Sequence, residues 1–177
     1  SKPVTIDSLN INGNFEYRFS DNWKGNLSAS RSKVVIDDYS SFAWGGCTVG
    51  CVTPNVGNYF TPEGGYDIYD FRSPDDTRRN DELQAALSGH FDTGTLGHEL
   101  TVGSSAFRRV VNNREAINHW LGSGNIDSEP DNLERYNGAL NDSHRRLDSR
   151  QYGVFFNDLI SFNEHWQTLI GGREVRL

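Results

Sequence analysis

Aromatic side chains gather in two long polar stretches of this sequence, where solvent-exposed loops would be expected. Exposed aromatic rings are unfavourable in water, so several of them in polar sequence predict a surface that contacts a ligand or a partner. Packing of loop against loop is the alternative for Tyr59, Phe60 and Tyr69. We expect ligand contacts, through apolar and stacking surface or through phenol hydrogen bonds, from Phe42, Trp44, Trp120, Tyr39 and Tyr66.

The two cysteines, Cys47 and Cys51, are separated by three residues. A metal site would need further ligands, and no Cys or His pair supplies them nearby. The spacing therefore favours a small-loop disulfide in an oxidising compartment over a metal site. Such a disulfide would rigidify the segment beside Trp44 and reduce the ordering cost of binding a ligand.

The remaining reactive side chains form no catalytic pattern. Acidic pairs such as Asp37–Asp38 and Asp75–Asp76 are adjacent in the chain, and adjacent residues of an extended chain point to opposite sides. The five histidines show no metal-ligand spacing, and nucleophile, P-loop and dinucleotide motifs are absent. These residues therefore predict no metal site and contain no recognised catalytic motif. A hydrolase that uses loop carboxylates is the alternative.

The composition is unusual for a soluble domain. Only 35% of the 177 residues are hydrophobic, whereas 12% are aromatic, which suits a sheet that is apolar on one face only. The formal charge of −7 argues against a general nucleic-acid binder, which would present a basic face. Neither a signal peptide nor an apolar run of about 18 residues is present.

Alternation of apolar and polar residues predicts strands rather than helices. Phe15, Tyr17 and Phe19 form one apolar stripe, and a return strand begins at Trp23. Similar pairs of stripes follow, each of roughly the 9–11 residues that a tilted membrane strand needs. Turn signals separate the partners of each pair at residues 20–22, 92–97 and 163–165. The sequence therefore predicts an all-β chain of three antiparallel hairpins with about six strands.

Two long irregular segments, near residues 37–80 and 112–148, connect these hairpins. Connections of that length are uncommon inside compact soluble domains. Short turns at one end and long loops at the other are typical of outer-membrane β-barrels. Clusters of Trp and Phe at the short-turn ends fit the aromatic girdle of such barrels. A soluble antiparallel sandwich with two long loops is the alternative.

Four segments resemble the β-barrel of TonB-dependent siderophore receptors. Residues 151–158 (QYGVFFND) and 166–173 (WQTLIGGR) are similar to two barrel strands of that family. Residues 93–103 resemble a turn and its following strand, and residues 15–23 (FEYRFSDNW) resemble another hairpin. The resemblance extends over nearly the whole chain. It implies that residues 1–177 are a partial β-barrel segment of a receptor in the bacterial outer membrane, without the plug domain.

Within that family the likeness is to ferrichrome-type receptors for hydroxamate siderophores. In those receptors an aromatic-x-aromatic-x-x-Cys stretch opens a disulfide-bearing external loop and contacts the ligand. The matching stretch here runs from Phe42 through Trp44 to Cys47, and Trp120 matches a further contacting aromatic. The spacing between Cys47 and Cys51 is shorter than in that subgroup.

The resemblance implies transport rather than catalysis. A ferric siderophore would be captured from outside and released inward by energy relayed through TonB to the plug. The siderophore fills the coordination of its iron, so we expect no cofactor. Expected partners are a ferric siderophore of hydroxamate type, TonB, and outer-membrane lipid and lipopolysaccharide, with no nucleic acid. A soluble β-sandwich module for carbohydrate or another ligand, and a passive porin, are the alternatives.

Overall fold

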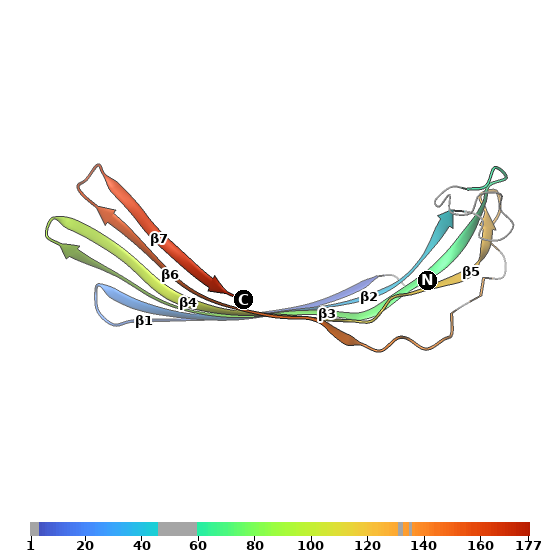
Figure 1. Cartoon of the computed structure of the whole chain (residues 1–177), viewed down its shortest axis with the longest axis horizontal. Coiled ribbons are helices and arrows are strands. Elements are labelled where there is room, and N and C mark those ends of the chain that lie inside the picture. Colours follow the sequence, from blue (N-terminus) through green and yellow to red (C-terminus); the bar gives the residue numbers. More distant parts are fainter. Residues whose placement is uncertain (1–3, 46–59, 131–132, 135) are drawn as a thin grey trace. The chain divides into compact units, whose positions relative to one another are not determined.

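The computed structural model describes residues 4–45, 60–130, 133–134 and 136–177. Within these ranges the chain consists of strands and their connections, as the alternation of side chains predicts. No helix in this part of the chain is long and apolar enough to cross a membrane. The strands, labelled as in Figure 1, are β1 (Thr5–Arg18), β2 (Trp23–Gly45), β3 (Gly65–Thr93), β4 (Leu96–Asn113), β5 (Ile117–Asn125), β6 (His144–Ser161) and β7 (Gln167–Arg176).

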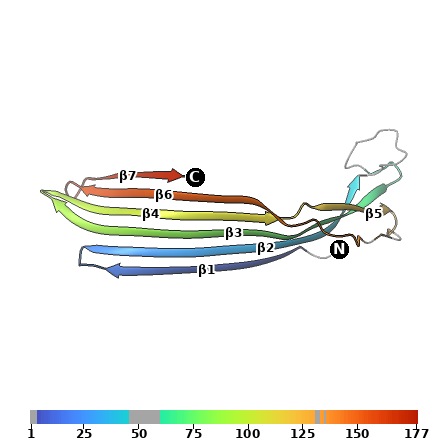
Figure 2. The same ribbon diagram turned by 60° about the horizontal axis from the view of Figure 1, so that its bottom comes forward.

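The strands join one sheet in the order β1-β2-β3-β4-β6-β7, and β5 pairs with β3 (Figure 2). β6 and β7 are antiparallel, from the pair Tyr152–Arg176 to the pair Ser161–Gln167. β3 and β5 are also antiparallel. The predicted all-β, antiparallel fold is therefore confirmed.

The three predicted short turns are present. They join β1 to β2, β3 to β4 and β6 to β7. The second turn has two residues between Thr93 and Leu96, and Gly94 adopts a φ of 67° there, a conformation that side chains with a Cβ rarely take. At each of these turns, strands that are consecutive in the sequence are also adjacent in the sheet.

The predicted bounds of the two long loops, 37–80 and 112–148, differ from the structure. β2 continues to Gly45, β3 already begins at Gly65, and β5 occupies Ile117–Asn125. These stretches are rich in Gly, Asn, Asp and Arg, and so carry no apolar stripe that would indicate a strand. Backbone hydrogen bonds to neighbouring strands hold them in the sheet regardless of side-chain polarity. Cys47 and Cys51, with the predicted disulfide, lie outside the described residues.

The strands divide into two compact units. Unit 1 comprises Ser1–Asp7, Val35–Thr77 and Asn112–Arg145; unit 2 comprises Ser8–Val34, Arg78–Val111 and Arg146–Leu177. Unit 1 contains the aromatic residues expected to bind a ligand. Unit 2 contains the short turns.

Unit 2 has one apolar face, and this face is exposed. Leu83, Tyr152 and Val154 line a shallow depression of about 430 Å³ and are 49%, 58% and 58% exposed. On the opposite face the hydroxyls of Ser88 and Thr101 lie 3.0 Å apart in a hydrogen bond. The sheet of unit 2 is therefore apolar on one side and polar on the other, with little apolar surface buried.

Candidate functional site

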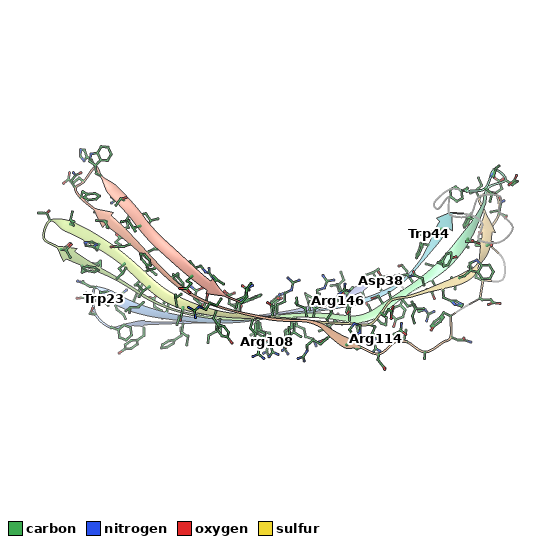
Figure 3. All side chains as sticks on the ribbon, viewed as in Figure 1. Trp23, Asp38, Trp44, Arg108, Arg114 and Arg146 are labelled. Carbon is green, nitrogen blue, oxygen red and sulfur yellow. The ribbon has the colours of Figure 1, made fainter. Side chains whose placement is uncertain are left out.

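One face of unit 1 brings together aromatic side chains from two adjacent strands. Phe42 and Trp44 are two residues apart on β2 and so point to the same face, with ring centroids 5.7 Å apart in an edge-to-face contact. Tyr69 of β3 stacks on Phe42 with a centroid distance of 6.3 Å. Figure 3 shows Trp44 on the inner side of the curve that the strands of unit 1 follow. We call this side of unit 1 the aromatic face.

Two side-chain contacts show how β2 and β3 are aligned. Phe42 contacts Tyr69, and three residues earlier Tyr39 lies against Arg72, three residues later on β3. Moving three residues backward along β2 thus corresponds to moving three residues forward along β3, as in an antiparallel pair. Trp44, two residues beyond Phe42, and Asp67, two residues before Tyr69, therefore lie on the same face of the sheet.

A β-bulge in β5 adds two more side chains to the aromatic face. Ile68 pairs with Gly122, whereas Tyr69 pairs with Trp120, so Leu121 is an extra residue on β5. Gly122 has a φ of 146°, which a residue with a Cβ rarely adopts. Without the extra residue, Trp120 and Ser123 would point to opposite faces, because they are three residues apart. With it, both point to the aromatic face.

Asp67 lies at the centre of this arrangement. Its Oδ1 accepts a hydrogen bond from the Trp120 indole N–H at 3.1 Å and another from the Ser123 hydroxyl at 2.8 Å. The residue is only 5% exposed, whereas Trp44 and Trp120 are 47% and 45% exposed. The aromatic face therefore combines half-exposed indole rings with a buried carboxylate.

The opposite face of unit 1 carries a second cluster. Arg72 donates to Asp70 at 2.7 Å, and its guanidinium lies 5.9 Å from the Tyr39 ring and 5.0 Å from the Tyr136 ring. Tyr66 is six residues from Arg72 on β3 and shares this face. An arginine between a buried carboxylate and two rings is a packed structural cluster, and its cation is already satisfied.

The structure thus separates the five predicted contact residues by face. Phe42, Trp44 and Trp120 converge on the aromatic face, whereas Tyr39 and Tyr66 lie on the opposite one. Sequence reasoning missed Asp67 and Ser123 and left open whether Tyr69 contacts a ligand or packs loop against loop. If this stretch had been recognised as a strand, the two-residue spacing of Asp67 and Tyr69 would have placed both side chains on one face.

Other polar residues among those described make structural contacts. In the part of the chain that the structure describes, no group of three His, Cys, Asp or Glu residues could hold a metal ion. Asp75, expected in a loop, lies on β3, where its carboxylate pairs with Arg114 at 3.1 Å. His98 connects Thr93 and Asp158 through its two ring nitrogens, at 2.7 Å and 2.9 Å. These contacts hold neighbouring parts of the sheet together.

Comparisons with known proteins agree with this architecture. A family model described as "TonB dependent receptor-like, beta-barrel" matches residues 2–175. No curated protein matches this chain. A solved structure of P. aeruginosa FpvA, bound as a ferric complex to a heterologous pyoverdine, is similar with a TM-score of 0.64 and 16% identity. That match covers 95% of this chain and 21% of the FpvA chain, and at this identity it concerns the fold alone.

Proposed function

Because this chain belongs to the TonB-dependent receptor-like β-barrel family, we propose that it is part of an outer-membrane receptor that imports ferric siderophores. The aromatic face of unit 1 is the surface that would contact the siderophore. The family is one of receptors, so the proposed activity is binding and transport without covalent chemistry.

The observation that carries this proposal is the convergence of Phe42, Tyr69 and Trp120 from three strands on one face. Rigid aromatic rings provide large contact area at low cost in conformational entropy. In a barrel the inner side of the curved sheet faces the lumen, the route of the ligand. Ligands bound by such a surface need no protein ligand for the iron, because the siderophore supplies its coordination.

The exposed apolar face of unit 2 supports a membrane location. Val154 and Tyr152 are each 58% exposed, although burying such side chains is favourable. In a bilayer this face would contact acyl chains, and the polar face with Ser88 and Thr101 would contact the lumen. A soluble β-sandwich would instead cover its apolar face with a second sheet.

Charged residues follow the apolar stripe of unit 2 and support a contact with lipopolysaccharide. Arg31 and Arg79 both pair with Asp81, and Arg108 forms a two-pronged pair with Asp148 at 2.7 and 2.9 Å. Guanidinium groups bind phosphate well, and this stretch lies where the apolar stripe ends. We propose lipopolysaccharide phosphate as a partner of these guanidinium groups in the intact receptor, through the N–H donors that their carboxylate partners leave unused.

We propose the siderophore class and the energy source by analogy with the family. Phe42, Trp44 and Cys47 keep the aromatic-x-aromatic-x-x-Cys order of ferrichrome-type receptors, which supports a hydroxamate ligand. The related FpvA structure holds a ferric pyoverdine. TonB would supply energy through a plug domain in the intact receptor.

The test is a binding titration of the intact receptor that contains this chain. Intrinsic Trp fluorescence would be followed while ferrichrome, ferrioxamine B, ferric pyoverdine or an iron-loaded catecholate siderophore is added. Saturable quenching by a hydroxamate ligand, weakened in Phe42→Ala and Tyr69→Ala, is the expected result. Tyr136→Ala, which removes a ring from the opposite face of unit 1, serves as the control.

Quenching by none of these ligands would overturn the siderophore proposal and favour a different substrate. Quenching by the catecholate or pyoverdine alone would retain the receptor function and reject the hydroxamate class. Equal weakening in Tyr136→Ala would reject the aromatic face as the contact surface.

A further inference from the structure

Asp67 has a carboxylate oxygen that the fold leaves unused. Oδ1 accepts two hydrogen bonds, whereas Oδ2 is buried and accepts none from the described part of the chain. A buried carboxylate oxygen without a donor is unfavourable, because it has lost its water and gained no partner. Buried acceptors are nearly always satisfied, so this oxygen indicates a donor beyond those that the described residues supply.

The surroundings of Asp67 favour a cationic donor. Trp120 is hydrogen-bonded to Asp67, Tyr69 is its neighbour on the same face, and Trp44 lies on that face two residues beyond Phe42. Faces of Trp and Tyr rings attract ammonium and guanidinium groups, and indole is the strongest of these rings. A carboxylate among such rings is a recurrent way to recognise an organic cation.

The nearest arginine on β3 does not neutralise Asp67. Arg72 lies on the opposite face of the sheet, where it is bound to Asp70 at 2.7 Å and packed against Tyr39 and Tyr136. The negative charge of Asp67 is therefore available to a ligand on the aromatic face. The net charge of the chain, −7, adds to the attraction for a positively charged molecule.

We infer that Asp67 recognises a positively charged amine or guanidinium group of the siderophore, held between the indole rings of Trp44 and Trp120. This inference rests on the proposed function and specifies the ligand further, as a ferric siderophore that carries a cation beside its iron centre. The cation donates to Oδ2, while Oδ1 keeps its bonds to the Trp120 indole N–H and the Ser123 hydroxyl. Because Trp120 stays bonded to Oδ1, rotation of the half-exposed Trp44 indole gives the cation access to the buried oxygen.

The test compares two ferric siderophores that differ only in charge. Ferrioxamine B carries a free terminal ammonium, and its N-acetylated form has the same iron centre without that cation. Equilibrium binding of both, loaded with radio-iron, would be measured on the intact receptor, on Asp67→Asn and on Asp127→Asn. Asp67→Asn keeps an oxygen for Trp120 and Ser123 but removes the charge. Asp127→Asn removes an equal charge from an exposed position of unit 1.

The wild-type receptor and Asp127→Asn should prefer ferrioxamine B over its acetylated form by about tenfold, the strength of one hydrogen bond to a charged group. In Asp67→Asn this preference should fall to within about twofold, while the acetylated form keeps its affinity. Equal binding of the two forms by the wild type, or a preference that survives in Asp67→Asn, would overturn the inference and leave the receptor function standing. If ferrichrome binds and neither form of ferrioxamine B does, the inference fails alone; if no siderophore binds, both proposals fail.

Discussion

The indole N–H of Trp120 donates a 3.1 Å hydrogen bond to Oδ1 of Asp67, although the two residues are 53 positions apart in the chain. This bond orients a half-exposed ring beside a buried carboxylate. It forms because the bulge at Leu121 turns Trp120 onto the same face as Asp67. Pairing across strands, rather than proximity in sequence, thus creates the aromatic face.

Replacing Trp120 tests the two functions of its side chain separately. Trp120→Phe keeps a ring for stacking but removes the N–H, and should weaken siderophore binding by about three- to tenfold. Trp120→Ala removes both and should weaken binding by more than tenfold, since aromatic anchors dominate such surfaces. Radio-iron binding to the intact receptor measures both variants. Equal affinity of Trp120→Ala and the wild type would exclude this ring from the site.

The bulge can be tested without altering a contact residue. Gly122 has a φ of 146°, so Gly122→Ala should strain β5 by about 1–2 kcal/mol and shift Trp120 and Ser123. Weaker siderophore binding with normal assembly in the membrane is expected. Gly13 in β1, where a Cβ would meet nothing within 4 Å, offers Gly13→Ala as the control. Unchanged affinity in Gly122→Ala would show that the bulge does not position the site.

The Arg72–Asp70 pair should stabilise unit 1 without contributing to binding. The Asp70 side chain is 7% exposed, so Arg72→Ala leaves a buried charge unpaired and should cost about 3–5 kcal/mol. Amide hydrogen exchange of β3 and β5 in the intact receptor reports this local free energy. Arg72→Ala combined with Asp70→Ala should cost less than the single change, as a coupled pair does.

The exposed ion pair of Lys24 and Glu16 is the control for the hydrogen-exchange measurement of Arg72→Ala. Both side chains are about half exposed and the two charged atoms are 3.2 Å apart. Lys24→Ala should change local exchange by no more than about 1 kcal/mol. A loss in Lys24→Ala as large as in Arg72→Ala would contradict the burial argument.

His98 should stabilise unit 2 at the end that carries the short turns. Its ring bonds to Thr93 at 2.7 Å and Asp158 at 2.9 Å and stacks on Phe91 with centroids 4.8 Å apart. His98→Ala should therefore lower the local stability of β3, β4 and β6 by about 1–3 kcal/mol, measured by hydrogen exchange. Siderophore affinity should not change. His165→Ala, in the exposed turn before β7, is the control, and an equal effect there would contradict the assignment.

Much of the fold could be predicted from the sequence because strand periodicity is local. The stripe of Phe15, Tyr17 and Phe19 and the return strand from Trp23 correspond to β1 and β2. The extent of β2 and β3 could not be predicted, since their polar ends lack an apolar stripe. There the strands are held by pairing with neighbours such as β5, which no local pattern reveals.

The site was partly predictable for the same reason. Phe42 and Trp44 share a face because they are two residues apart, a relation visible in the sequence. Placing Asp67 on that face required the contact between Phe42 of β2 and Tyr69 of β3, and its link to Trp120 required the bulge in β5. Tyr39 was grouped with Phe42 by closeness in sequence, yet three residues along a strand reverse the direction of a side chain.

The most direct test of the central claim compares the two faces of unit 1. Siderophore affinity would be measured by radio-iron binding to the intact receptor after alanine replacement of Phe42 or Tyr69, on the aromatic face, and of Tyr39 or Tyr66, on the opposite face. Losses of more than about tenfold for the first pair and less than about twofold for the second are predicted. Equal losses on both faces, or a larger loss for Tyr39 and Tyr66, would contradict the assignment of the aromatic face as the siderophore site.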